Sequence, residues 1–355
     1  MTVDYAQPIA MARDKVAEGG HRLGFLDGWR TIAVLVVITS HVTGFRQEPL
    51  LLKQIARWLP VGEIGVLIFF FISGFVISRS ALFEIRTTSD FSVKAFYIRR
   101  FFRIIPPLAL YLVTCLVLGA LGIVDFQLHN AIPAFLYVCN IETFNQCIWL
   151  GGHTWSLAFE EQFYLLFPAL LVLFMLRRTP FLPHLIGAAI FCLLPLFWPL
   201  SYSGRYDFYL IYGLFGAGFL AARYEAVIFE TLRKHATAWF LIATAMVLFT
   251  PVTLPWATLA NNYPLTFVVT IPLMVICSGW TGFSALLSNS FIRYLGRISY
   301  GIYLWQELAT SELFRQRSLL VEVLAIIGIV VLCAILFEVM EKPLISLGRR
   351  LSKAG

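Results

Sequence analysis

The chain of 355 residues is 59% apolar and only 13% charged, with a mean hydropathy of +0.80. A soluble domain is about 45–50% apolar and about a quarter charged. This composition excludes an ordinary soluble enzyme and a disordered chain, and six cysteines are too few for a secreted disulfide scaffold. We therefore expect an all-α polytopic membrane protein embedded in a lipid bilayer.

The chain divides into two tails and one membrane domain. Residues 1–24 carry charged side chains and lack the apolar core of a cleavable signal peptide, which predicts a cytoplasmic tail. Residues 25–342 are expected to form the membrane domain, and 343–355 a basic cytoplasmic tail. About 20 apolar residues make one span, and ten spans are predicted at 31–48, 61–78, 104–123, 158–176, 183–200, 207–222, 238–254, 264–280, 291–310 and 320–340.

The basic residues test this span count, because Lys and Arg concentrate in cytoplasmic loops. With ten spans and Arg30 set aside, 20 basic residues lie on the side of the N-terminus and six on the opposite side. This asymmetry favours ten spans with both termini in the cytoplasm. It also explains the net charge of +7 without a nucleic-acid partner.

The first span carries two ionisable groups on one helix face. Arg30 and His41 are eleven residues apart, which is about 20° past three full turns and about 16 Å along a helix. Asp27 lies three residues before Arg30, close enough to pair with its guanidinium. An ionisable residue within a membrane span is a functional candidate. The alternative is that Arg30 only reaches the membrane interface and that His41 is a structural histidine.

The next candidates are Ser73 within the second span and an arginine cluster that opens the third. Arg100 and Arg103 are three residues apart and share a helix face. Two forked guanidiniums suit a phosphate-rich ligand that arrives from the cytoplasm. Ordinary anchoring by positive charge is the simpler explanation of such a cluster.

The longest outer loop, residues 124–155, contains no Lys or Arg. Its Cys139 and Cys147 could form a local disulfide in an oxidising compartment, or remain two free thiols. The other four cysteines fall in predicted spans, where they are expected to act as small packing residues. The cysteines and histidines do not have the spacing of a metal site, so no metal is expected.

A polar stripe opens the fourth span. Ser156, Glu160 and Tyr164 follow one another at four-residue spacing and therefore lie on one helix face. A helix-capping arrangement of Ser156 and Glu160 is the alternative. In the ninth span Gln306 and Glu307 are further polar points.

Five blocks, taken together and in this order, resemble the acyltransferase-3 family of integral membrane acyltransferases. They are Leu-Asp-Gly-x-Arg with a histidine eleven residues after the arginine (Arg30, His41), Phe-Phe-Phe-Ile-Ser-Gly-Phe (69–75), Arg-x-x-Arg (Arg100, Arg103), Trp-Ser-Leu-x-x-Glu-Glu-Gln-Phe-Tyr (155–164) and Leu-Gly-Arg-Ile-Ser-Tyr-Gly-Ile-Tyr-Leu-Trp (295–305). One departure is Gln306, where the family commonly has a histidine. A glutamine cannot relay a proton near neutral pH.

The resemblance implies a functional role for each of these residues. Family members mostly O-acetylate bacterial surface glycans, using cytoplasmic acyl-CoA as the donor, which places this chain in a bacterial inner membrane. Arg30, Arg100 and Arg103 would then bind the CoA phosphates. His41 would act as general base, or form a transient acyl-imidazole, and Glu160 would orient the imidazole or the acceptor hydroxyl. The positions expected to support the site are Asp27, Ser73, Ser156, Tyr164 and Gln306.

Two other functions fit a polytopic protein with buried ionisable groups. A transporter or flippase of a glycan or small molecule would use them as a permeation path, although the paired repeats that many transporters show are not recognisable in this sequence. A receptor or inactive scaffold would keep the fold and lose the chemistry, and Gln306 leaves that alternative open.

Overall fold

The computed structural model describes six stretches of the chain, namely residues 23–44, 62–141, 147–171, 205–253, 264–315 and 318–353. These residues form helices joined by turns and loops, with no strand among them, which confirms the prediction of an all-helical protein. The predicted fifth span, 183–200, lies outside the described residues.

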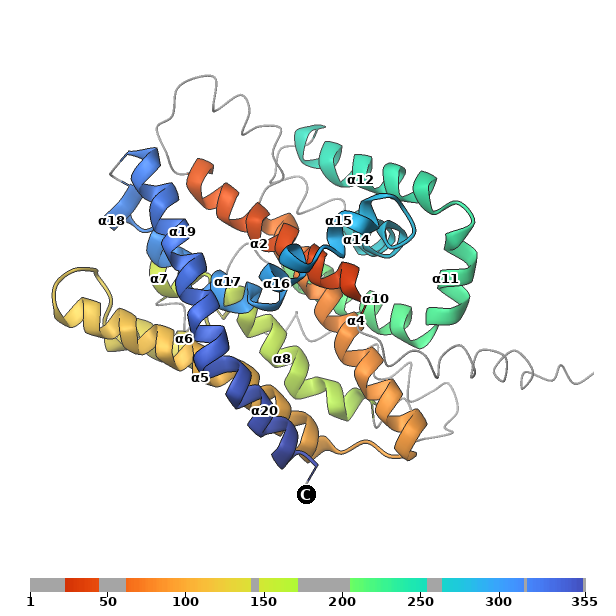
Figure 1. The fold of residues 1–355 in the computed structure, drawn as a ribbon, viewed down its shortest axis with the longest axis horizontal. Coiled ribbons are helices and arrows are strands. Elements are labelled where there is room, and N and C mark those ends of the chain that lie inside the picture. The colour runs from red at the N-terminus through yellow and green to blue at the C-terminus, as the bar shows by residue number, and fades with distance from the viewer. Residues whose placement is uncertain are drawn as a thin grey trace, which may run out of the picture.

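Figure 1 shows the arrangement of these helices, with α2 across the middle of the molecule. In chain order they are α2 (Gly24–Gly44), α4 (Gly62–Thr88), α5 (Val93–Ala120), α6 (Leu128–Phe135), α7 (Trp149–Gly152), α8 (Thr154–Leu171), α10 (Arg205–Arg223), α11 (Glu225–Arg233), α12 (Ala236–Thr253), α14 (Pro264–Ser278), α15 (Phe283–Leu287), α16 (Ser290–Arg297), α17 (Ser299–Ala309), α18 (Glu312–Arg315), α19 (Leu319–Leu336), η4 (Phe337–Glu341) and α20 (Lys342–Leu351).

Among the described residues, four helices are long and apolar enough to cross a membrane. They are α2, α4, α5 and the continuous run of α19, η4 and α20. A bent pair, α10 and α11, meets at 89° and makes a fifth if it is counted as one broken span. The protein is therefore embedded in the membrane. The count of ten spans and the cytoplasmic side of the termini stay predictions.

The ninth predicted span, 291–310, is not one helix. It is divided into α16 and α17 at Ile298, whose backbone leaves the helical conformation (φ −91°, ψ 4°). The 11 residues of α17 reach about 16 Å, which is half of the roughly 30 Å hydrocarbon layer. The break separates α17 from α16, which packs on α2. Arg293 and Arg297 interrupt the apolar residues just before the break.

Glycines allow the central helices to approach backbone to backbone, as small residues do in membrane helix pairs. A Cβ on Gly296 of α16 would lie 1.8 Å from the Asp27 carbonyl oxygen of α2. At the crossing of α4 and α10, a Cβ on Gly74 would lie 2.6 Å from the Phe215 carbonyl oxygen, and one on Gly218 would lie 2.5 Å from the Phe75 nitrogen. These contacts fix where α2 and α4 hold their polar residues.

We expect the Gly296→Ala variant to be less stable than wild type by about 1–3 kcal/mol, because the added methyl group forces α16 away from α2. The measurement is the thermal unfolding midpoint in detergent, and unfolding is monitored as the loss of the monodisperse peak. Gly328→Ala in α19 is the matched control, since no heavy atom lies within 4 Å of its Cβ. Equal midpoints for the two variants would contradict this close packing.

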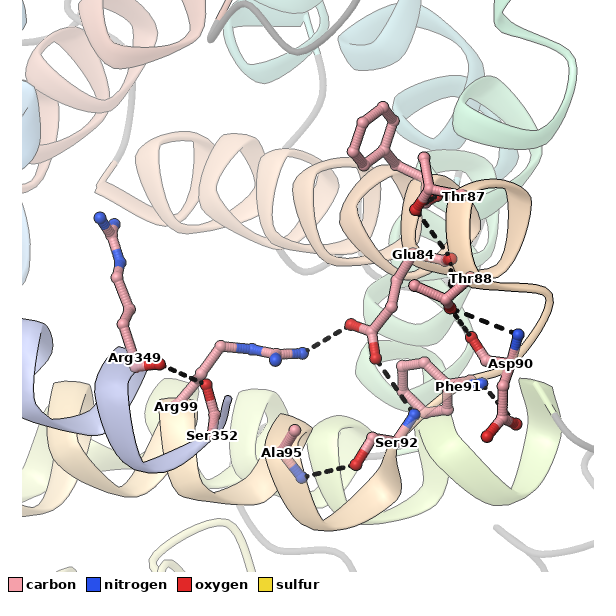
Figure 2. Close-up of polar contacts among 11 residues, drawn as sticks. Glu84, Thr87, Thr88, Asp90, Phe91, Ser92, Ala95, Arg99, Arg349 and Ser352 are labelled. Carbon is pink, nitrogen blue, oxygen red and sulfur yellow. Dashed lines mark hydrogen bonds and ion pairs between the residues drawn. The ribbon is translucent and has the colours of Figure 1, made fainter. Parts of the chain in front are cut away.

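A tight turn between α4 and α5 orients the arginine-bearing start of α5. Ser92 caps α5 by accepting a hydrogen bond from the Ala95 nitrogen at 3.2 Å. Glu84 of α4 accepts from the Ser92 nitrogen at 3.1 Å and pairs with Arg99 of α5 at 2.8 Å. Figure 2 shows Glu84 bridging the two helices in this way. The first turns of α5 are therefore fixed against the end of α4.

Candidate active site

Two cavities share three arginines. The smaller cavity has a volume of about 70 Å³ and the larger about 500 Å³. Arg30 of α2 and both Arg100 and Arg103 of α5 line the two cavities together. The three residues predicted to bind phosphates thus meet at one junction, although 70 residues of sequence separate Arg30 from Arg100.

The larger cavity is strongly cationic. Two acidic side chains, Asp27 and Glu225, line it, against the arginines Arg30, Arg79, Arg86, Arg99, Arg100, Arg103 and Arg349. Asp27 lies 3.9 Å from the Arg30 guanidinium, which confirms the pairing expected from their spacing. Such a concentration of one charge raises the local concentration of anions.

The smaller cavity contains a hydrogen-bonded carboxylate, Glu160 of α8. Glu160 accepts hydrogen bonds from the Ser73 hydroxyl of α4 and from the Tyr164 hydroxyl one turn along α8. The Arg100 guanidinium lies 5.0 Å from the centre of the Tyr164 ring. These contacts connect the carboxylate of the smaller cavity to the arginine junction.

Ser156 lies in the same lining and connects α8 to α17. Its hydroxyl lies 2.6 Å from the Tyr303 hydroxyl, and both hydroxyls donate to the His153 carbonyl oxygen, at 3.1 and 3.0 Å. The polar stripe predicted for Ser156, Glu160 and Tyr164 therefore does face one cavity. Ser156 and Glu160 do not form the helix cap that was the alternative, because Ser156 donates to a carbonyl oxygen and Glu160 accepts from Ser73.

His41 of α2 lies against α17, outside the residues that line the two cavities. Its Nδ1 atom is 3.0 Å from Gln306 Oε1 and 3.3 Å from Glu307 Oε1. The Gln306 amide nitrogen donates to the same Glu307 oxygen at 3.0 Å. Both α17 side chains are buried, whereas 22% of the His41 side chain is exposed.

These contacts select one tautomer of His41. Both atoms facing Nδ1 are oxygen acceptors, so Nδ1 carries the hydrogen of the neutral ring. Nε2 is then the nitrogen with a free lone pair, able to accept a proton. Gln306, the departure from the family pattern, holds this tautomer in place without relaying a proton itself.

An aromatic residue borders the imidazole. The Trp149 ring of α7 lies 5.4 Å from the His41 ring, and its indole nitrogen donates to the Glu307 carbonyl oxygen at 3.3 Å. Two residues before Trp149, Cys147 forms a disulfide with Cys139. The disulfide alternative for these two cysteines is thus the one found, and it closes the loop that leads to Trp149.

A carboxylate other than Glu160 lies beside His41. The residue beside His41 is Glu307, whereas the contacts of Glu160 are with Ser73 and Tyr164. The two roles expected for Glu160, orienting the imidazole or the acceptor hydroxyl, stay predictions, and Glu307 is the carboxylate in contact with the imidazole. From the sequence Glu307 is only a polar point, because residues 266 apart in the chain give no local signal.

His153 is the other site residue missed from sequence. It is 5% exposed, its ring contacts Tyr111 and Tyr303, and neither ring nitrogen has a hydrogen-bond partner among the described residues. Its place in the turn between α7 and α8 carries no sequence motif of its own.

The described cysteines match their expected role as small packing residues in part. Within the described stretches, Cys115, Cys277 and Cys333 are free and buried, as packing residues are. Cys192 lies outside these stretches. In the described part of the chain, no group of three or more His, Cys, Asp or Glu side chains is placed to hold a metal ion.

Fold and site define a membrane-embedded helical protein whose arginine-lined cavity suits an anionic ligand. The chain belongs to the acyltransferase-3 family, whose acyltransferase domain matches residues 23–339. No solved structure matches it. O-acetyltransferase OatA of Staphylococcus aureus strain NCTC 8325 / PS 47 is 37% identical over 166 residues, and OatA of strain COL has the same identity. Each match covers 43% of this chain and 25% of the relative.

Proposed function

We propose that the protein is an O-acetyltransferase of a bacterial cytoplasmic membrane. It takes an acetyl group from cytoplasmic acetyl-CoA and transfers it to a hydroxyl group of a cell-surface or lipid-linked carbohydrate. Family membership supports the acyl transfer, and the names of the relatives support acetyl as the group. The observation that carries the proposal is α2 itself, one helix with Arg30 at the cationic junction and His41 against Glu307.

The donor binds across the junction of the cavities. Its pyrophosphate pairs with Arg30, Arg100 and Arg103, and guanidiniums suit phosphate oxygens because they donate paired hydrogen bonds. The pantetheine arm runs along α2 toward His41. Arg30 and His41 are about 16 Å apart along this helix, which leaves room between the phosphate anchor and the thioester.

His41 acts as the general base. Its Nε2 accepts the proton of the acceptor hydroxyl while the hydroxyl oxygen attacks the thioester carbonyl carbon. The carbon–sulfur bond then breaks, and the proton passes from the imidazolium to the departing sulfur, which leaves as the thiol of CoA. Glu307 and Gln306 keep the ring oriented, and Glu307 stabilises the imidazolium while it exists.

A covalent route uses the same atoms in another order. Nε2 attacks the thioester first, the thiol leaves, and the hydroxyl then attacks the acyl-imidazole. Rapid denaturation after mixing with radiolabelled acetyl-CoA separates the routes. Label that stays on the protein in wild type and is absent from His41→Gln indicates the covalent route.

We expect Glu307→Gln to lower kcat about 100-fold and to leave the KM for acetyl-CoA unchanged, because the variant keeps the shape and loses the charge that supports the imidazolium. Glu307→Asp should recover part of kcat. Glu312→Gln, an exposed residue of α18, is the control. A rise in KM without a fall in kcat would contradict this positioning role.

Reconstitution tests the proposed reaction. Purified protein in liposomes receives radiolabelled acetyl-CoA on one side and soluble glucose or N-acetylglucosamine oligomers on the other. We expect label in alkali-labile esters of the oligomers, and none with His41→Gln. In cells, mass spectrometry of surface glycans with and without the protein identifies the natural acceptor by its missing acetyl esters.

The same liposomes distinguish a transporter from an enzyme. A transporter would move the oligomers, or CoA itself, across the bilayer without attaching label. That outcome would replace the enzymatic proposal with the transport alternative.

A further inference from the structure

The arginines of the larger cavity differ in whether the protein itself neutralises them. Arg79 pairs with Glu225 at 2.8 Å, and Arg99 pairs with Glu84 at 2.8 Å. Figure 2 shows the second of these pairs, in which Glu84 is also held by the backbone at the start of α5. The first ion pair joins α4 to α11, and the second joins α5 to α4.

Arg86 and Arg349 differ from Arg79 and Arg99. Both line the larger cavity and both are exposed, Arg86 in the last turn of α4 and Arg349 in the last turn of α20. Among the described residues, neither guanidinium has an ion-pair partner. In Figure 2 the Arg349 side chain extends from α20 away from α5. Two uncompensated positive charges at one cavity repel each other and attract an anion.

The donor has two separate anionic groups for a cavity of this kind. In CoA a pyrophosphate joins the pantetheine arm to the nucleoside, and a phosphate monoester lies on the 3′ position of the ribose. The proposed function uses Arg30, Arg100 and Arg103 for the first group. They line both cavities, whereas Arg86 and Arg349 line the larger cavity alone.

We propose that Arg86 and Arg349 form a second phosphate subsite, which binds the 3′-phosphate of CoA and makes the protein prefer CoA to 3′-dephospho-CoA. This inference rests on the proposed donor. The cavity volume of about 500 Å³ lies within the range of roughly 300–1,000 Å³ for small-molecule sites. The adenosine would lie between the two groups of arginines.

A phosphate could also come from the headgroup of an anionic lipid, because exposed arginines near a membrane surface attract such lipids. The experiment therefore uses nanodiscs made of phosphatidylcholine alone and nanodiscs that also contain phosphatidylglycerol. Full-length protein in each is titrated with CoA and with 3′-dephospho-CoA, and the Kd of each is measured by equilibrium dialysis.

We expect wild type to bind CoA about tenfold more tightly than 3′-dephospho-CoA in phosphatidylcholine, since the extra phosphate makes charge-assisted hydrogen bonds. The double variant Arg86→Gln, Arg349→Gln should bind both equally, at the wild-type Kd for 3′-dephospho-CoA. That unchanged Kd also shows that the variant is folded. Arg350→Gln, the neighbouring exposed arginine that does not line the cavity, should keep the tenfold preference.

Two results would overturn the inference and leave the proposed donor intact. One is equal binding of the two ligands by wild type. The other is a preference that survives in the double variant while that variant retains less phosphatidylglycerol, which would make the subsite one for lipid. If wild type binds neither ligand, both the donor assignment and this inference fail.

Discussion

We expect the His41→Ala variant to lose acetyl transfer by at least about 100-fold and to bind acetyl-CoA with the affinity of wild type. The reason is that general-base catalysis contributes about 10²–10⁴ in rate, and the imidazole lies away from the three arginines proposed to bind the phosphates. Transfer rate is measured with labelled donor in liposomes, and affinity by titration of the purified protein.

Two further variants make this result interpretable. His129→Ala removes an exposed histidine near the start of α6 and should leave transfer unchanged. His41→Gln keeps a side chain beside Gln306 and Glu307, so a loss of transfer in this variant reflects chemistry and not a collapsed site. Transfer within tenfold of wild type in His41→Gln would remove His41 from the mechanism.

We also expect Arg100→Gln combined with Arg103→Gln to raise the Kd for acetyl-CoA about 100-fold. A hydrogen bond to a charged group contributes about 1.5–3 kcal/mol, and each tenfold change in Kd corresponds to 1.4 kcal/mol. Binding is measured by titration at two salt concentrations, because loss of two charges also flattens the salt dependence.

The effect of this double variant should be equal for CoA and for 3′-dephospho-CoA, since the pyrophosphate is common to both. Lys94→Gln is the matched control, as an exposed residue of the same helix that lines neither cavity. An unchanged Kd in the double variant would mean that the cavity junction does not hold the donor, whatever reaction the protein performs.

Helical periodicity predicted the part of the site that lies on single helices. The pairing of Asp27 with Arg30 follows from a three-residue spacing. The stripe of Ser156, Glu160 and Tyr164 follows from a repeated four-residue spacing. The resemblance to the family then predicted which arginines belong together, and the two cavities bring them together.

Contacts between distant segments could not be predicted in this way. The pairing of His41 with Glu307 depends on how α17 packs against α2, and the break at Ile298 lies inside a segment that the sequence predicts as one span. His153 is buried between aromatic rings of α5 and α17, which no pattern within its own turn reveals.

The shared arginines also bear on membrane energetics. An enzyme that hands a group from one side of a membrane to the other needs a polar path through the hydrocarbon, and such a path threatens the ion gradients on which the cell depends. Arg30, Arg100 and Arg103 place fixed positive charge where the two cavities meet. Positive charge in a pore repels protons and metal cations. The residues proposed to bind the donor would therefore also act as an electrostatic seal against cation leakage.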